Sequence, residues 1–465
     1  MLFVEPRFLP FFLVAFGIYW LARGQDTRKA WLLICSYAFY AAWDYRFLSL
    51  IFVSTAVDFC VGLGLARTDN PAQRKRLVIT SLAVNLGILG VFKYFDFFAG
   101  SLAELLGLLG VPVNRTTLEI VLPLGISFYT FQTLSYSLDL YRRRIEVCRK
   151  PLDFALFVAF FPQLVAGPIV RAGNFLPQLQ RRAELRDVQI RSCLVLFFVG
   201  FFKKACISDN LSPYVDAYFA SPGAFDAPSG ALAVVLYSIQ IYCDFSGYSD
   251  MAIACAGLLG FHIPKNFDFP YFATDIAGFW RRWHISLSSW MRDYVYIPLG
   301  GNRYGALLTS RNLFLTMVIS GLWHGAAWNF VVWGCFHGAG IILHRALPTG
   351  TTNPSFAVRG MKWLGTYAFV LVGWVLFRSA DLATSGQILA DVLFLSGGGG
   401  AHLHSGLWLL PAGLAGLHAL ARRGAGRRAF VSLPPAVFAL VYGAAFGIAI
   451  TLANASYQPF IYFQF

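Results

Sequence analysis

Long apolar runs constrain this chain more than any other feature of its sequence. Runs of about twenty apolar residues recur between short basic loops, and a helix of that length crosses the hydrocarbon core of a bilayer. About eleven such runs can be distinguished, starting near Phe8, Ala30, Phe47, Leu77, Leu118, Leu194, Gly230, Asn312, Trp363, Gly406 and Pro434. The sequence therefore predicts an all-α polytopic membrane protein in which residues 1–465 form one membrane domain.

The composition supports lipid as the solvent for most of the chain. Hydrophobic residues make up 57% of the 465 residues and charged residues only 13%, whereas soluble domains carry roughly 25% charged residues. The net charge of +14 comes from basic residues in short loops rather than on one soluble domain. This distribution argues against a nucleic-acid partner and favours contact with anionic lipid headgroups.

The distribution of lysine and arginine predicts how the chain is oriented. Loops rich in Lys and Arg stay on the cytoplasmic side of a membrane. They comprise residues 23–29, 67–76, 142–150, 181–191, 281–303, 345–362 and 422–428. Residues 208–229 contain three Asp but no Lys or Arg and belong outside. This count of basic loops places the N-terminus and the tail that ends at Phe465 on the extracytoplasmic side of the membrane.

Residues 153–171 fit this count only if they do not cross the membrane. Both flanks are basic, and Pro162 and Pro168 break any helix between them. Irregular backbone at membrane depth is tolerated where protein or water covers it. We therefore predict a re-entrant segment beside a protein-lined cavity.

Several absences narrow the function. The eight cysteines form no C-x-x-C pair and no metal-ligand spacing, so we expect neither a disulfide nor a bound metal or cofactor. The chain also lacks the glycine-rich phosphate loop of ATP-driven pumps and the nucleophile elbow of serine hydrolases.

A histidine inside an apolar stretch is the first candidate for chemistry. His324 lies in the sequence Leu322-Trp-His324-Gly, within the apolar residues 312–343. Because both flanks are basic, this stretch must enter the membrane and return as two short helices, with a break near His324 and Gly325. An ionisable side chain at this depth is a functional candidate. From the residues alone, a packing histidine bonded to Ser320 is equally compatible.

Aromatic and polar side chains near this histidine complete a candidate substrate tunnel. Trp323 and Trp328 offer flat walls for an acyl chain, and Asn329 ends the same motif. Ordinary packing is the alternative for both tryptophans. His337, thirteen residues after His324, is a second candidate, although ring packing or a backbone hydrogen bond is the favoured interpretation.

A polar segment inside the run that begins near Gly230 carries two carboxylates. Asp244 and Tyr248 are one helical turn apart, as are Ser246 and Asp250, so each pair can share a hydrogen bond on one face. Carboxylates in a membrane span are costly, which favours a polar tunnel lining or a carboxylate that orients the intramembrane histidine. Interhelical polar contacts are the alternative. The predicted lining comprises Asp244, Tyr248, Ser249 and Asp250.

Residues 267–303 alternate aromatic and basic side chains and are too polar to span. They predict an interfacial or re-entrant helix. Its arginines could hold the phosphate groups of a donor, and snorkelling at the interface is equally compatible. The four candidates are Arg281, Arg282, Arg292 and Arg303. His284 lies among them and could assist catalysis or bond a loop carbonyl.

Four motifs together resemble the bacterial branch of the membrane-bound O-acyltransferase family, and the likeness is closest to its alginate-acetylating type. They are Phe279-Trp-Arg-Arg-Trp-His284, Leu322-Trp-His324-Gly, Asp244-Phe-Ser-Gly-Tyr-Ser-Asp250 and Pro298-Leu-Gly-Gly-Asn302-Arg. The resemblance implies re-entrant segments and a ring of helices around a central tunnel. It also implies His324 as the catalytic base, with His284 in a second motif position.

The resemblance further implies a route for the acyl group. The donor would be cytoplasmic acetyl-CoA or another acyl thioester, acting as a substrate rather than a cofactor. The acetyl group would pass to periplasmic acetyltransferase partners that complete the O-acetylation of an exported polysaccharide such as alginate or cellulose. The uncharged tail at residues 458–465 is a candidate docking element, with interfacial packing as the alternative. A polysaccharide or lipid transporter and a non-catalytic scaffold of a secretion complex stay open as alternatives.

Overall fold

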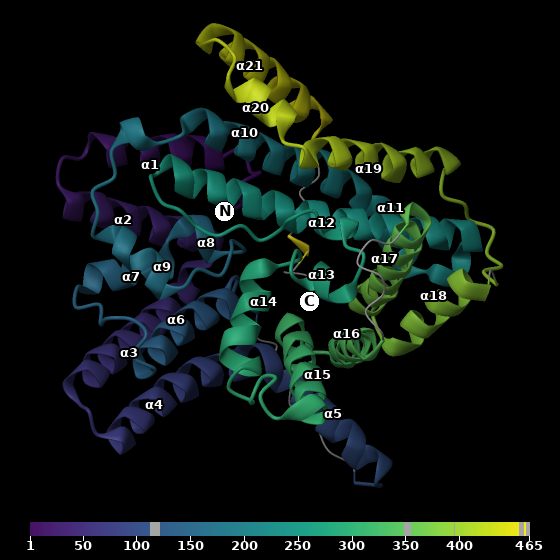
Figure 1. Cartoon of the computed structure of the whole chain (residues 1–465), viewed down its shortest axis with the longest axis horizontal. Coiled ribbons are helices and arrows are strands. Elements are labelled where there is room, and N and C mark those ends of the chain that lie inside the picture. The colour runs from purple at the N-terminus through teal and green to yellow at the C-terminus, as the bar shows by residue number, and fades with distance from the viewer. Residues whose placement is uncertain (112–120, 348–354, 395, 455–459, 462–465) are drawn as a thin grey trace. The chain divides into compact units, whose positions relative to one another are not determined.

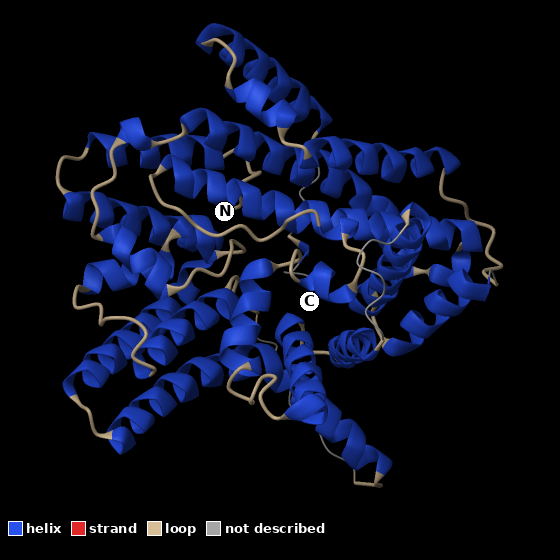
Figure 2. Ribbon diagram, viewed as in Figure 1, coloured by secondary structure: helices blue, strands red, loops and turns tan. Residues whose placement is uncertain are grey.

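The computed structural model describes residues 1–111, 121–347, 355–394, 396–454 and 460–461 (Figure 1). Within these ranges there is no strand, only isolated bridges at Phe225 and Asp226, and helices make up the regular structure (Figure 2). The predicted all-α architecture is therefore confirmed for the described residues.

Six helical segments of the described chain are long and apolar enough to cross a membrane. They cover residues 25–67, 71–108, 227–258, 305–324, 356–378 and 435–452. Each predicted apolar run contains a helix. The count of about eleven spans stays a prediction, because the helices in several of the predicted runs are shorter than a full span.

The chain divides into two compact units. Unit 1 comprises residues 1–193 and 252–264, and unit 2 comprises residues 194–251 and 265–465. That both belong to one membrane domain stays a prediction. The helices of unit 1 are α1 (Phe8–Leu21), α2 (Gln25–Asp44), α3 (Leu48–Arg67), α4 (Pro71–Leu89), α5 (Phe95–Leu108), α6 (Ile126–Tyr141), α7 (Pro151–Ala159), α8 (Phe161–Leu164) and α9 (Ala172–Leu179).

Unit 2 begins inside α10 (Ile190–Phe201) and contains most of α12 (Ala227–Leu258). Its other main elements are the π-helix η4 (Phe202–Ser208), α11 (Asp209–Ala220), α13 (Ile276–Trp280), α14 (Ile285–Met291), the π-helix η7 (Arg292–Tyr296), α15 (Gly305–His324), α16 (Trp328–Ala346), α17 (Phe356–Arg378), α18 (Leu382–Phe394), α19 (Leu409–Arg422), α20 (Ala425–Val431) and α21 (Pro435–Leu452).

A buried polar network ties α3, α4 and α6 together in unit 1. The carboxylate of Asp58 accepts hydrogen bonds from Ser137 Oγ at 2.6 Å, from Asn85 Nδ2 at 2.7 Å and from Ser81 Oγ. Ser54 Oγ in turn donates to Asn85 Oδ1 at 2.6 Å. Buried polar groups are stable only when they are hydrogen-bonded, so this network fixes the three helices against one another.

The segment predicted to be re-entrant is folded into short pieces. Helix α7 has nine residues and α8 has four, so α7 is about 14 Å long, half the thickness of a hydrocarbon core. Nearly every residue from Phe154 to Val170 is buried. The segment is thus covered by protein, and both its re-entrant path and the cavity beside it stay predictions.

Helices α15 and α16 form a tight hairpin in unit 2. A side chain at Gly321 would lie 2.1 Å from the carbonyl oxygen of Phe330, and one at Gly334 would lie 2.6 Å from that of Met317. Only glycine permits such a close approach of two backbones. The predicted break is confirmed, because α15 ends at His324 and α16 begins at Trp328.

The prediction that the arms of this hairpin are short is wrong. They contain 20 and 19 residues, and at 1.5 Å per residue each arm is about 30 Å long. The first arm is longer than expected because α15 already starts at Gly305, ahead of the apolar stretch. Each arm therefore has the length of a full span.

Candidate active site

His324 lies in an aromatic environment built from three helices. Its side chain is buried at the end of α15, with 5% of the residue exposed. The imidazole is edge-on to the rings of Trp323, Trp333 and Phe377, with centroid distances of 5.1, 5.1 and 5.3 Å. We refer to these three residues as the aromatic cage. Sequence analysis selected only Trp323, because the other two rings come from α16 and α17.

His284 lies next to this cage. It is fully buried in the loop between α13 and α14, and its ring centroid is 6.5 Å from that of His324 and 5.9 Å from that of Trp323. The ring also packs edge-on against Phe245 of α12 at 4.5 Å. Burial lowers the pKa of the His284 imidazole to about 3, so the ring is neutral at physiological pH. The two histidines selected from the sequence are thus neighbours.

Asn266 holds the backbone around His284. His284 has a φ of +43°, in the left-handed region that is unfavourable for a residue with a side chain. The Asn266 carbonyl accepts from the backbone N–H of Ile285 at 2.9 Å, and its Oδ1 accepts from Ser286 Oγ at 2.6 Å. Asn266 Nδ2 donates to Ser249 Oγ at 3.2 Å. Ser249 therefore supports this loop, and Asn266 is a residue that sequence analysis missed.

His337 lies one ring away from His324. Its ring centroid is 4.6 Å from that of Trp333 and 5.0 Å from that of Trp280. Since Trp333 belongs to the aromatic cage, His337 packs behind the cage. This placement agrees with the packing role that was favoured for it.

The start of α16 holds the other two residues of the predicted tunnel. Asn329 is buried and its Nδ2 donates to the carbonyl oxygen of Ser379 at 2.8 Å, which joins α16 to the end of α17. Trp328 is 54% exposed. Most of its indole therefore faces away from the buried aromatic cage.

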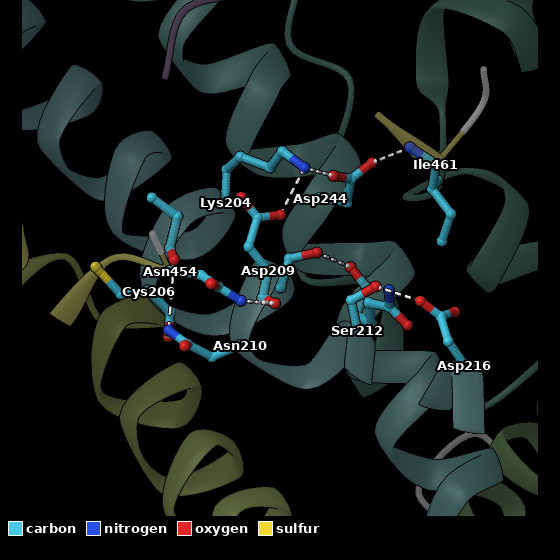
Figure 3. A network of polar contacts seen from close by, with 12 residues as sticks. Lys204, Cys206, Asp209, Asn210, Ser212, Asp216, Asp244, Asn454 and Ile461 are labelled. Carbon is cyan, nitrogen blue, oxygen red and sulfur yellow. Dashed lines mark hydrogen bonds and ion pairs between the residues drawn. The ribbon is translucent and has the colours of Figure 1, made fainter. Parts of the chain in front are cut away.

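The carboxylates of α12 meet two lysines that sequence analysis did not select. Lys204 Nζ lies 2.6 Å from Asp244 Oδ1 and 2.6 Å from Asp209 Oδ1 (Figure 3). Lys203 Nζ lies 2.5 Å from Asp250 Oδ2 and donates to Ser246 Oγ at 2.7 Å. Asp244 is thus part of an ion-pair cluster, which differs from the expectation that it orients His324.

A close helix crossing explains these pairs. A side chain at Gly200 of α10 would lie 2.6 Å from the carbonyl oxygen of Gly247 in α12, and the reverse distance is 2.7 Å. Directly after this crossing the chain widens into the π-helix η4, which carries both lysines. The signal in the sequence was two adjacent lysines inside one apolar run and two aspartates inside another.

Three of the four arginines selected as donor-binding residues have local partners for their side chains in the structure. Arg281 and Arg292 are more than half exposed, and each lies within 3.7 Å of a nearby carboxylate. The guanidinium of Arg303 donates to two backbone carbonyls of the preceding turn, both at 3.1 Å. Arg282 is half-buried, and its carbonyl accepts from the backbone N–H of Asp268 at 3.0 Å. Their role in donor binding stays a prediction.

The described part of the predicted docking tail is buried. Phe460 is fully buried, 5.6 Å from Phe245 and 5.3 Å from Tyr248 between ring centroids. The backbone N–H of Ile461 donates to Asp244 Oδ2 at 2.9 Å. These two side chains are therefore unavailable for docking. The other residues of the predicted element, 458–459 and 462–465, lie outside the described residues.

Comparison with known proteins supplies the family. The model of the membrane-bound O-acyltransferase family, MBOAT, matches residues 149–383. The chain is 44% identical over 386 residues to the probable alginate O-acetylase AlgI of Pseudomonas putida, covering 82% of this chain and 77% of that protein. It is 44% identical over 379 residues to the protein of the same name from Pseudomonas aeruginosa, covering 81% and 71%. It is 36% identical over 435 residues to the peptidoglycan O-acetyltransferase of Helicobacter pylori, covering 87% and 82%.

The buried histidine pair, the apolar helices and these similarities define a multi-pass membrane acyltransferase. The chain belongs to the membrane-bound O-acyltransferase family. The resemblance first noted in its motifs is thereby confirmed, and the protein is an enzyme that transfers acyl groups to oxygen.

Proposed function

We propose that the protein takes acetyl groups from a cytoplasmic thioester and passes them across the membrane. There they are used for the O-acetylation of an exported polysaccharide. The observation that carries this proposal is the buried pair of imidazoles, His324 and His284, whose ring centroids lie 6.5 Å apart at the end of the α15 hairpin arm. The names of two relatives, an alginate O-acetylase and a peptidoglycan O-acetyltransferase, support an acetyl group and a glycan acceptor. Alginate, cellulose and peptidoglycan are the acceptors to be compared.

We assign the role of general base to His324. A hydroxyl oxygen attacks the thioester carbonyl while His324 takes the hydroxyl proton, the carbon–sulfur bond breaks, and the proton passes to the leaving thiolate. A base in this position contributes about 10²–10⁴-fold to the rate. The aromatic cage excludes water from the reacting acyl group. Burial lowers the pKa of His284 to about 3, which makes it a poor proton acceptor, so we assign it a supporting role in the geometry of this site.

The donor in this proposal is acetyl-CoA or another acyl thioester. Its phosphate groups require cations, and we assign this role to the exposed guanidinium groups of Arg281 and Arg292, which would exchange their carboxylate partners for phosphate. This stretch belongs to a basic loop, so we place the donor on the cytoplasmic face of the inner membrane.

The acceptor in this proposal lies on the opposite face. A passage sized for a two-carbon acyl group would be too narrow for a sugar polymer. We therefore assign the last step to a partner, a periplasmic acetyltransferase that accepts the acetyl group and passes it to the polysaccharide. The two termini belong on the same outer side as this partner.

The test is reconstitution in liposomes, with acetyl-CoA on one side and the polymer, with or without the partner, on the other. We expect acetylated polymer only with the partner present and none with His324→Ala. Efficient acetylation by the purified protein alone, with donor and acceptor on one side, would contradict the relay. In cells, His324→Ala should stop acetylation while polymer export continues, and loss of export instead would favour a transporter or a scaffold.

The orientation is tested by labelling single cysteines from each side of the membrane. Ala72→Cys, at the exposed start of α4 within the basic segment 67–76, should react only with reagent on the cytoplasmic side. Labelling of this position from outside would break the proposed topology.

A further inference from the structure

The chain that follows α21 is held against unit 2 at its beginning. Asn454 Nδ2 donates to the carbonyl oxygen of Asp209 at 3.0 Å, and Asn210 Nδ2 donates to that of Leu452 at 2.9 Å (Figure 3). Cys206 Sγ lies 3.2 Å from the carbonyl oxygen of Ala449. The end of α21 is thus fixed to η4 and to the start of α11 by side chains that bind backbone.

The same segment is held a second time at Ile461. Its backbone N–H donates at 2.9 Å to one carboxylate oxygen of Asp244, and the other oxygen lies 2.6 Å from Lys204 Nζ. Lys204 also contacts Asp209, the residue whose carbonyl binds Asn454. Figure 3 shows that Lys204 lies between the two aspartates. One buried cation therefore links both attachment points of the segment.

This attachment leads directly to the active site. Phe460, next to Ile461, is fully buried and packs against Phe245, which follows Asp244 in α12. Phe245 in turn packs edge-on against His284 at 4.5 Å between ring centroids. Protein interiors are close-packed, so loss of the Phe460 ring would free Phe245 and let His284 move.

We propose that Lys204 and Asp244 are positioning residues, which anchor the segment at residues 460–461 as a fixed wall of the active site and so hold His284 in place. The inference rests on the proposed role of the two histidines in acyl transfer. Neither residue touches the reacting atoms. Both act through the Ile461 amide, Phe460 and Phe245.

A neighbouring ion pair provides a matched control. Lys203 and Asp250 lie on the same two elements, η4 and α12, and their closest approach is 2.5 Å. The hydrogen bonds and ion pair of Lys203 go to Asp250 and Ser246, not to the segment after α21. Removal of either lysine takes one positive charge from the same helix, but only Lys204 anchors residues 460–461.

The experiment compares Lys204→Met and Asp244→Asn with Lys203→Met in the full-length protein. Acetyl transfer is measured as kcat and KM for acetyl-CoA, and seating of the segment is measured by hydrogen exchange of the Ile461 amide. For both anchor variants we expect faster exchange and a kcat lowered about tenfold, with KM changed less than about twofold, since no donor contact is removed. Lys203→Met should leave both readouts near wild type, and Lys204→Arg should restore most of kcat.

Several outcomes would overturn the proposal. Faster amide exchange with an unchanged kcat would show that the segment does not position the site, and equal effects of the two lysine variants would show a general effect of charge. If Lys204→Met fails to fold, Phe460→Ala decides, because it leaves the ion pairs intact and should lower kcat by the same factor. Full activity of His324→Ala would refute the proposed function and leave the exchange result standing.

Discussion

Units 1 and 2 both bury polar side chains, but they surround them differently. In unit 1, Asp58 is surrounded by hydroxyl and amide donors, and Arg74 donates to backbone carbonyls at the ends of α3 and α6, including those of Leu65 at 2.6 Å and Leu140 at 3.0 Å. In unit 2, the imidazole of His324 lies among aromatic rings. Both units are helical and apolar, so the contrast lies in the groups that face each buried polar side chain.

This difference distinguishes a scaffold from a site. A carboxylate or guanidinium whose hydrogen bonds all go to neighbouring helices fixes those helices, and any change of partner costs stability. The buried imidazole of His324 instead packs against aromatic rings, and buried ionisable groups of this kind are candidates for catalysis. Substitutions in unit 1 should therefore change stability, whereas those at the histidines should change turnover.

His324 should give the largest effect. We expect His324→Ala and His324→Gln to lower acetyl transfer by about 10²–10⁴-fold, because the general base is lost. The midpoint of thermal unfolding in detergent should stay near that of the wild type. Near wild-type acetyl transfer by a well-expressed variant would contradict the assignment of His324 to the active site.

Asp58 should give the opposite pattern. Asp58→Ala leaves the donors of Ser81, Ser137 and Asn85 buried without their acceptor, and we expect it to lower the free energy of unfolding by about 2–3 kcal/mol. The kcat of the protein that remains folded should not change. Asp58→Asn, which keeps one acceptor, is the control and should cost less. A specific loss of kcat at full stability would place chemistry in unit 1.

His284 should make the stability of the protein depend on pH. Burial lowers the pKa of its imidazole to about 3, against about 6.5 in an exposed chain. Between these values the unfolded chain binds a proton that the folded protein excludes, so the free energy of unfolding falls as the pH falls below 6.5. We expect a loss of about 2 kcal/mol from pH 7 to pH 5.

The control for this pH dependence is His284→Ala. It should remove this contribution, so its denaturation midpoint should fall less between pH 7 and pH 5 than that of the wild type. It should also lower kcat by about tenfold, less than His324→Ala, because a supporting contact rather than the base is lost. An unchanged pH dependence of stability in the variant would assign the effect to another group.

The smallest effect concerns Arg74. Its guanidinium contacts four backbone carbonyls, and an ammonium group cannot reach all of them with the same fork of donors. We expect Arg74→Lys to lower the free energy of unfolding by about 1 kcal/mol and to leave kcat unchanged. Denaturation and acetyl-transfer assays on the same preparation measure the free energy of unfolding and kcat. A fall in kcat at unchanged stability would contradict the assignment of Arg74 to the scaffold.

Features of the fold and of the site that depend on residues close together in the sequence could be predicted, whereas those that depend on contacts between distant segments could not. The break at His324 and the short helices near Pro162 follow from hydrophobic runs, flanking charges and helix-breaking residues, all of which are local. The pairing of Lys204 with Asp244 was missed because it depends on the backbone crossing at Gly200, which no local pattern reveals.

The rest of the site was missed for the same reason. Two rings of the aromatic cage, Trp333 and Phe377, come from helices that meet His324 only in the folded chain. Asn266 supports the His284 loop from outside the motif that contains it. Phe460 was assigned to an outer tail because an uncharged aromatic sequence suits either an interface or an interior, and contacts with α12 decide for the interior.

The short helix α7 has a consequence for how the protein is made. A stretch of nine residues is too short to leave the translocation channel as a stable span by itself. Its contacts are with α2, α3, α6 and α9 of the same unit. We therefore expect α7 to take its place only after the longer helices α2, α3 and α6 are inserted. Late assembly of unit 1 is then a step at which a mutant chain can be recognised and degraded even when its histidines are intact.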